Sequence, residues 1–181
     1  MSLNGPPRAV TVARVQAIEI SLTWRWIPVV ALGTWLLSQS VLPSRFPTWN
    51  LLTSWLIGGT AVLAGEAALL LHEVSHALVA RWYGQRVTRI VFHGFVAETI
   101  VEPSEGPSPT HDLVIALAGP TINLLLAGLV EIARIALLSR GPLDVLLLML
   151  VLGNAAAAVM SLLPLGASDG ARAVRALRRA R

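Results

Sequence analysis

Residues 51–82 read LLTSWLIGGTAVLAGEAALLLHEVSHALVARW. This run is longer than the roughly 20 apolar residues that cross the hydrocarbon layer of a bilayer, so it predicts a membrane-spanning helix that tilts, bends or protrudes. Besides Arg81 at its end, four ionisable residues interrupt the run: Glu66, His72, Glu73 and His76. Such groups are costly inside a membrane helix unless they pair, bind a metal ion or face water. The same stretch therefore predicts both the fold class and a functional site.

Three further apolar runs lie outside this stretch, at residues 24–42, 113–138 and 143–163. Of the 181 residues, 55% are hydrophobic and 13% are charged, whereas a soluble domain carries about 25% charged residues. The sequence predicts an all-α polytopic membrane protein with four transmembrane helices. We expect one membrane-embedded domain over residues 1–181.

Residues 86–101, between the second and third spans, differ in composition. They are rich in β-branched residues and contain Gly94 near the middle. This pattern predicts two short strands, a small β-hairpin between spans two and three.

The arginines predict an orientation. With the N-terminus inside, most of them fall on one side: Arg8, Arg14, Arg81, Arg86, Arg89, Arg172, Arg175, Arg178, Arg179 and Arg181. The positive-inside rule then predicts a multi-pass protein of the cell (inner) membrane with both termini cytoplasmic. The net charge of +4 fits a membrane protein better than a nucleic-acid partner. The arginine-rich segment after Gly170 predicts a short interfacial helix.

The residues His72-Glu73-Val74-Ser75-His76 predict a metal site. On a helix, positions i and i+4 lie on one face, so both imidazoles can bind one ion. Glu73 projects close by and can take a proton from the attacking water. Because the chain has no cysteine, the remaining ligand must be His, Asp or Glu.

A catalytic zinc site usually has three protein ligands and one open position. Asp169 lies at the depth of His72 and His76 by topology, and nearby Gly166 and Gly170 favour an irregular backbone there. Four other residues on that side are rival ligands: His93, Glu98, His111 and Asp112. Spacing alone leaves the choice open.

Three motifs resemble the site-2 proteases, a family of intramembrane zinc metalloproteases, in its prokaryotic branch without a PDZ insertion. They are the HExxH helix, the Gly119-Pro120-Thr121-Ile122-Asn123 element and the segment from Leu162 to Arg172 around Asp169. The resemblance implies one Zn²⁺ per chain on His72, His76 and Asp169, with Glu73 catalytic. Ser161 stands where the family usually has an asparagine that helps to position substrate or the oxyanion. Asn123, Asn154 and Ser161 are therefore candidates for that role.

The resemblance also implies a function: regulated intramembrane proteolysis near the cytoplasmic face. The partners would be the lipid bilayer and transmembrane substrates, such as membrane-tethered transcription factors or anti-sigma factors. The residues 87–100 can hold an unwound substrate by β-addition, or form a merely structural hairpin. The alternative function is a catalytically inactive scaffold or a metal-binding protein that retains the fold. Glu66 has two equally good interpretations: it lines a polar path to the metal, or it bonds to Asn123 or Asn154.

Overall fold

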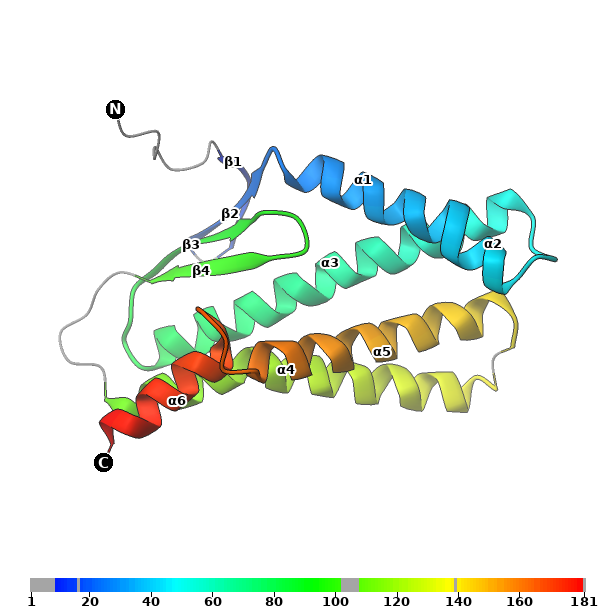
Figure 1. Ribbon diagram of the computed structural model, residues 1–181. Helices are drawn as coiled ribbons and strands as arrows, with labels where there is room; N and C mark the ends of the chain where they lie inside the picture. Colours follow the sequence, from blue (N-terminus) through cyan, green and yellow to red (C-terminus); the bar gives the residue numbers. More distant parts are fainter. Residues whose placement is uncertain (1–8, 16, 102–107, 139, 181) are drawn as a thin grey trace.

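The computed structural model describes residues 9–15, 17–101, 108–138 and 140–180; Arg8 and Arg181 lie outside this part of the chain. Long helices run side by side along one axis, and a small sheet covers one end of them (Figure 1). The elements in chain order are β1 (Ala9–Val15), β2 (Ile18–Thr23), α1 (Trp26–Leu36), the π-helical turn η1 (Leu37–Val41), α2 (Leu42–Arg45), α3 (Leu51–Trp82), β3 (Val87–Phe92), β4 (Ala97–Val101), α4 (Pro109–Ala136), α5 (Pro142–Leu162) and α6 (Asp169–Arg179).

Four helical segments of the described chain are long and apolar enough to cross a membrane: Trp26–Arg45, Leu51–Trp82, Pro109–Ala136 and Pro142–Leu162. The predicted all-α polytopic fold class is confirmed, with span ends within a few residues of those expected. α3 begins where the Asn50 side chain accepts a hydrogen bond from the Thr53 N–H at 2.8 Å. α4 begins with Pro109, but Ser108 makes no side-chain capping bond.

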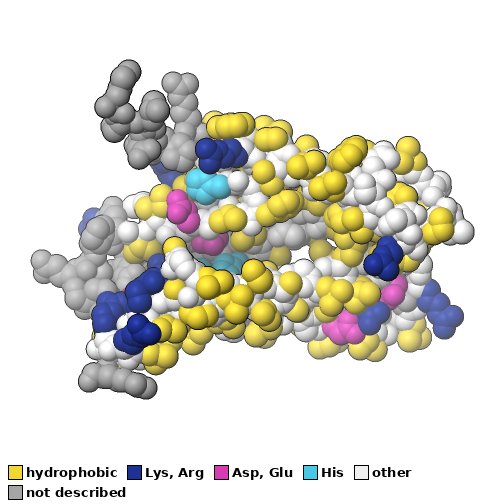
Figure 2. All heavy atoms as spheres, in the orientation of Figure 1, with side chains coloured by type: hydrophobic (Ala, Val, Ile, Leu, Met, Phe, Trp, Pro, Cys, Tyr) yellow, Lys and Arg dark blue, Asp and Glu magenta, His cyan; other side chains and the backbone are white. Residues whose placement is uncertain are grey.

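Large apolar side chains are exposed around the helices, for example Leu56, Leu129 and Leu152 at 60%, 63% and 60%. Figure 2 shows hydrophobic side chains over the middle of the visible face and arginines toward its two ends. An apolar outer surface with charged ends is suited to a bilayer, because lipid covers the apolar side chains and water solvates the charges.

The sheet has the strand order β1-β2-β3-β4. The pairs β1–β2 and β3–β4 are antiparallel, and β2 pairs with β3 in parallel. The predicted hairpin between spans two and three is confirmed as β3 and β4. The sequence analysis missed β1 and β2, which pair with each other, and β2 joins the sheet through β3 about 70 residues later.

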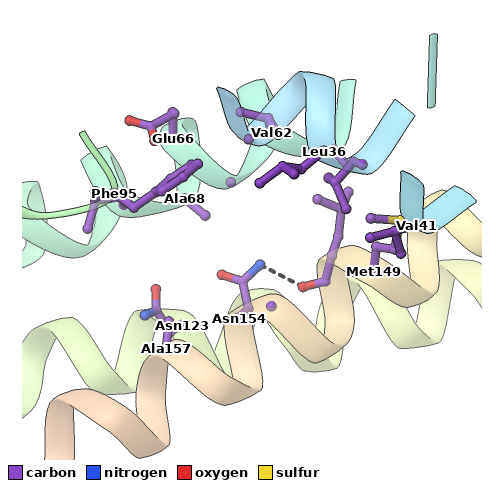
Figure 3. Close-up of a pocket in the computed structure, with 17 residues that line it drawn as sticks. Leu36, Val41, Val62, Glu66, Ala68, Phe95, Asn123, Met149, Asn154 and Ala157 are labelled. Atoms are coloured by element: carbon purple, nitrogen blue, oxygen red, sulfur yellow. Dashed lines mark hydrogen bonds between the residues drawn. The ribbon is translucent and has the colours of Figure 1, made fainter. Parts of the chain in front are cut away.

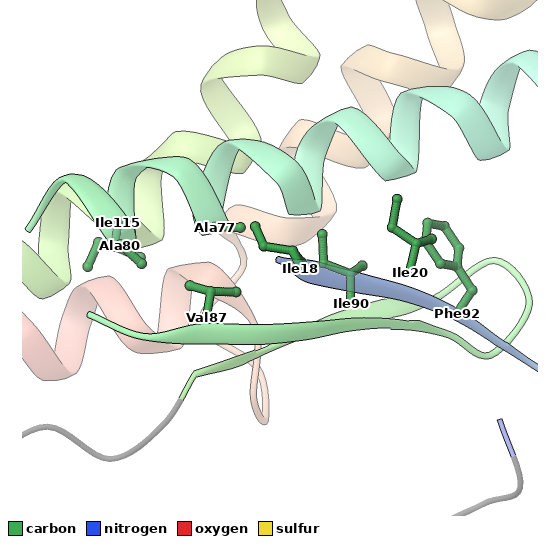
Figure 4. Close-up of a cluster of buried hydrophobic side chains, with 8 residues drawn as sticks. All are labelled: Ile18, Ile20, Ala77, Ala80, Val87, Ile90, Phe92 and Ile115. Atoms are coloured by element: carbon green, nitrogen blue, oxygen red, sulfur yellow. The ribbon is translucent and has the colours of Figure 1, made fainter. Parts of the chain in front are cut away.

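The sheet packs against the C-terminal part of α3 (Figure 4). Its buried side chains meet two alanines of α3 that are fully buried, Ala77 and Ala80. Because alanine is small, the strands approach the helix closely at the turn that follows His76. The other members of this core are Ile18, Ile20, Val87, Ile90, Phe92 and Ile115. This packing places β4 beside the predicted metal-binding turn.

The predicted helix near the C-terminus is present as α6. The Ser168 side chain caps it by accepting a hydrogen bond from the Ala171 N–H at 3.2 Å. One face of α6, with Ala173 and Ala176, is buried where the helix packs on α4. α6 is therefore docked on the protein, and Asp169 in its first turn is held in a fixed position.

Candidate metal centre

Three buried side chains from two helices meet at one point. His72 and His76 come from α3, and Asp169 comes from α6. The distance from His72 Nε2 to Asp169 Oδ2 is 3.1 Å, and from His76 Nε2 to Asp169 Oδ1 it is 3.2 Å. The two Nε2 atoms are 3.1 Å apart. Among the residues that the structure describes, this is the only group of three or more such side chains close enough to share a metal ion.

The three ligand atoms fit a tetrahedral zinc ion. Zinc–nitrogen and zinc–oxygen bonds of about 2.0 to 2.2 Å at tetrahedral angles place neighbouring ligand atoms roughly 3.3 Å apart. The distances between the three side chains are close to that value. Two imidazoles and one carboxylate also form a donor set found in catalytic zinc sites, which leave a fourth position open.

Both imidazoles are fixed by contacts to the nitrogen that faces away from this point. His76 Nδ1 lies 2.7 Å from the Ile115 carbonyl oxygen of α4. His72 Nδ1 lies 3.1 Å from the amide nitrogen of Asn123, also on α4. If a metal ion binds Nε2 of an imidazole, the ring proton is on Nδ1. The Asn123 amide can rotate so that its oxygen accepts a hydrogen bond from Nδ1–H of His72. That oxygen is buried and has no partner among the described atoms.

Gly119 of α4 lies directly against the two imidazoles. A Cβ atom at this position would overlap the Nε2 atoms of both His72 and His76. α4 therefore packs closely on α3 at this glycine, against the Nε2 atoms of both histidines. No larger residue fits here without displacing a ligand.

Asp169 is held by the backbone around it. A Cβ atom on Gly170 would overlap the Leu162 carbonyl, so this glycine lets the first turn of α6 contact the end of α5. Burial raises the pKa of the Asp169 carboxyl, but hydrogen bonding to His72 and His76 outweighs burial and holds the pKa well below its usual value. The carboxyl is therefore ionised at neutral pH, as a metal ligand must be.

Glu73 lines the same cavity, which has a volume of about 760 Å³. Thr99 of β4 donates a hydrogen bond from Oγ1 to Glu73 Oε2 at 2.7 Å, and the same hydroxyl lies 3.2 Å from the Glu73 carbonyl oxygen. This contact fixes one carboxylate oxygen and leaves the other for the cavity. Sequence reasoning missed Thr99, because nothing local marks one threonine among the β-branched residues of a strand.

The four rival ligands are not part of the His72, His76 and Asp169 group, although Glu98 lines the same cavity. His93 Nε2 is 3.5 Å from Glu98 Oε1, the His111 ring stacks on Tyr83 at 4.0 Å, and Asp112 binds Arg179 at 2.6 Å. None of them belongs to the group around His72. The geometry therefore favours Asp169 as the third ligand.

The three candidates for oxyanion or substrate contacts are placed differently. Asn123 and Ser161 line the metal cavity. The Ser161 hydroxyl donates to the Ala158 carbonyl oxygen at 3.1 Å. Asn154 lines a second cavity instead, and its amide nitrogen donates to the Leu150 carbonyl oxygen at 2.8 Å. Asn154 is thus not among the residues that line the metal cavity.

The second cavity has a volume of about 600 Å³ and lies among α1, η1, α3 and α5 (Figure 3). Glu66 is on its wall and accepts a hydrogen bond from Trp26 Nε1 at 2.8 Å. Of the two interpretations offered for Glu66, the bond to Asn123 or Asn154 is not present among the described residues, where these amides contact His72 and the Leu150 carbonyl oxygen. Phe95, at the tip of the β3–β4 hairpin, lines this cavity and the metal cavity, so its ring lies where the two adjoin.

Comparisons with known proteins point to one family. "Putative zinc metalloprotease Rip3" of Mycobacterium tuberculosis, in strains Erdman and H37Rv, is 30% identical over 171 residues, which cover 93% of this chain and 43% of the relative. "Putative zinc metalloprotease sll0528" of Synechocystis is 27% identical over 152 residues, which cover 84% of this chain and 39% of the relative. No protein-family model matches the chain.

A solved structure shares the fold. The site-2 protease from Methanocaldococcus jannaschii superposes with a TM-score of 0.62 at 17% identity, over 96% of this chain and 73% of that protein. This chain has the fold of a site-2 protease. Both curated relatives are named as putative zinc metalloproteases, and the His-His-Asp group of this chain offers ligands suited to zinc. The chain spans less than half the length of the curated relatives it matches.

Proposed function

We propose that this chain is a zinc endopeptidase that cuts membrane-spanning segments of other proteins near the cytoplasmic face, with both of its own termini cytoplasmic. One observation carries the proposal. His72, His76 and Asp169 converge in a cavity among helices able to span a membrane, and Glu73 lies in that cavity. A scaffold needs no such cluster, and a metal carrier needs no carboxylate beside it.

The bound zinc ion would polarise the scissile carbonyl and make water reactive near neutral pH. The chain's own residues supply the rest. Glu73 takes the proton from the attacking water and delivers it to the leaving amine, so the peptide bond breaks with no net change at Glu73. His72 and His76 stay fixed throughout, because α4 holds their Nδ1 atoms.

Thr99 orients the carboxylate of Glu73, and it does so from the outer strand of the sheet. β4 pairs with β3 on one side, and no strand of the described chain pairs with its other side. An unwound substrate added along this edge would lie beside Glu73 and the metal ligands, which supports the β-addition mode. Thr99 then links the strand that binds substrate to the base.

We expect Thr99→Val to lower kcat about tenfold, because a hydrogen bond to a charged group contributes roughly 1.5 to 3 kcal/mol. KM and zinc content should stay near the wild-type values, since valine keeps the shape of the strand. Thr99→Ser should restore kcat. Steady-state cleavage of a membrane-spanning peptide in detergent, with zinc measured by mass spectrometry, checks this.

The matched control is Thr121→Val on α4, where the hydroxyl only bonds the Leu117 carbonyl oxygen. A Thr99→Val enzyme with unchanged kcat, or one that loses its zinc, would contradict the positioning role.

The scissile carbonyl oxygen needs hydrogen-bond donors as negative charge develops on it. Asn123 and Ser161 are the two candidates that line the cavity; the Asn123 amide is engaged with His72, and the Ser161 hydroxyl is engaged with the Ala158 carbonyl oxygen. The substrates proposed are transmembrane segments, including those of membrane-tethered transcription factors and anti-sigma factors.

Glu66 gives the adjoining cavity a polar wall, which supports a route for water to the metal.

Metal removal tests the proposal directly. We expect the purified protein to hold one zinc ion per chain and to cleave a helix-destabilised spanning peptide in vesicles. Treatment with 1,10-phenanthroline should abolish cleavage, 1,7-phenanthroline, which does not chelate, should leave it intact, and added zinc should restore it. Zinc bound without any cleavage would favour the scaffold or metal-binding alternative.

A further inference from the structure

α6 brings two arginines to the wall of the metal cavity. Arg172 and Arg175 line it together with His72, His76 and Asp169. They are three residues apart on a helix, so they share one face. Within residues 9–15, 17–101, 108–138 and 140–180, neither arginine forms an ion pair with a carboxylate.

The other arginines of the same helix serve as a comparison. Arg179 is paired with Asp112 of α4, and Arg178 is exposed and does not line the cavity. The charge on the cavity wall is therefore specific to Arg172 and Arg175 and is not a general property of α6.

The opposite wall of the cavity carries a negative charge. Glu98 of β4 lines the cavity, and its side chain is 65% exposed. A peptide lying in the cavity thus has a carboxylate on its strand side and two guanidinium groups on its α6 side. Such an arrangement discriminates between substrates by charge, because like charges across a cavity repel and opposite charges attract.

The spacing along α6 indicates where on a substrate the arginines act. Asp169 and Arg175 are six positions apart, which is about 9 Å along a helix at 1.5 Å per residue. An extended peptide advances about 3.3 Å per residue. Arg175 is therefore level with a side chain about three residues from the bond that lies at the metal ligands.

We propose that Arg172 and Arg175 form a subsite for an acidic side chain of the substrate, about three residues from the scissile bond. The inference rests on the proposed function and adds a substrate preference to it. A guanidinium group binds a carboxylate through two parallel hydrogen bonds, and both arginines have donors to give. A lipid phosphate is the other anion near a membrane. Arg175 is exposed, as Arg178 and Arg179 are, but of these three arginines only Arg175 lines the cavity that contains the candidate metal ligands.

The experiment uses a set of spanning peptides that differ at one position. Each peptide carries Asp, Asn or Lys at one of the positions two to four residues on either side of the cut. We expect the wild-type protein to cleave the best-placed Asp peptide about tenfold faster than its Asn version, the factor that corresponds to one hydrogen bond to a charged group. The Lys version should be slower still.

Charge reversal gives the decisive comparison. Arg175→Glu should reverse the preference, so that the Lys peptide at the same position becomes the better substrate, and Arg175→Lys should keep the preference for Asp. Arg178→Glu, on the same helix but outside the cavity, is the matched control and should behave like the wild type.

Binding separates this proposal from the proposed function. Fluorescence anisotropy of the same peptides on Glu73→Gln measures the preference for Asp without turnover, so the subsite is tested even if no cleavage occurs. Equal affinities for the Asp, Asn and Lys peptides would overturn it. So would an Arg175→Glu effect that is the same for all peptides and depends on phosphatidylglycerol rather than phosphatidylcholine in the vesicles, which would assign the arginines to lipid.

Discussion

Glu73→Gln is expected to keep its zinc and lose cleavage by about 100- to 10,000-fold, the usual contribution of a positioned general base. Glutamine has nearly the same shape and still accepts the Thr99 hydrogen bond through its amide oxygen. It cannot take a proton from water. The change therefore removes proton transfer and leaves the metal ligands in place.

The measurement pairs zinc content with cleavage of a spanning peptide. Ser75→Ala is the control on the same turn, since its hydroxyl only bonds the His72 carbonyl oxygen at 2.6 Å; it should keep both zinc and activity. A Glu73→Gln protein that still cleaves at a tenth of the wild-type rate would rule out Glu73 as the base.

Asp169→Asn has the second large expected effect, on metal affinity. The change removes the only anionic ligand of the three. Loss of an outer partner already costs roughly 10- to 100-fold in affinity, so loss of a ligand should cost more. We expect the protein to be purified without zinc and to be inactive. Competition with a fluorescent zinc chelator gives the affinity.

Asp112→Asn is the matched control for this variant. Asp112 lies at the start of α4, binds Arg179 at 2.6 Å and was a rival ligand by sequence. It should keep its zinc. If Asp112→Asn loses the metal and Asp169→Asn keeps it, the third ligand has been assigned wrongly. Circular dichroism of both variants separates loss of metal from loss of the fold.

The two variants together distinguish the three functions. An enzyme needs both Glu73 and Asp169. A metal carrier needs Asp169 for binding but tolerates Glu73→Gln, and a scaffold tolerates both changes in its partner binding. The partly buried hydrogen bond from Thr99 to Glu73 favours the enzyme, because it fixes a carboxylate that a carrier or scaffold has no use for.

The sequence by itself determined the spans and placed two of the proposed ligands, His72 and His76, on one helix face. A long apolar run must be a helix in a bilayer, because the backbone has no water to bond there. Two histidines four residues apart must share a helix face. The hairpin of β3 and β4 was also predictable, since the β-branched run and Gly94 are local signals. Topology alone placed Asp169 at the depth of His72 and His76, but it left four rival ligands on the same side. The resemblance to the site-2 proteases then selected Asp169.

Tertiary structure decided what depends on contacts between distant segments. β2 pairs with β3 although the chain passes through two spans between them. Thr99 reaches Glu73, Asn123 reaches His72, and Arg175 reaches the metal cavity only because the sheet, α4 and α6 all dock on the same end of α3. Residue type and spacing carry no information about such contacts, since each is set by the packing of two elements whose sequences give no sign of their partner. The sequence therefore predicted the turn with His72, Glu73 and His76, and the packing around α3 decided which groups hold these proposed ligands and the proposed base.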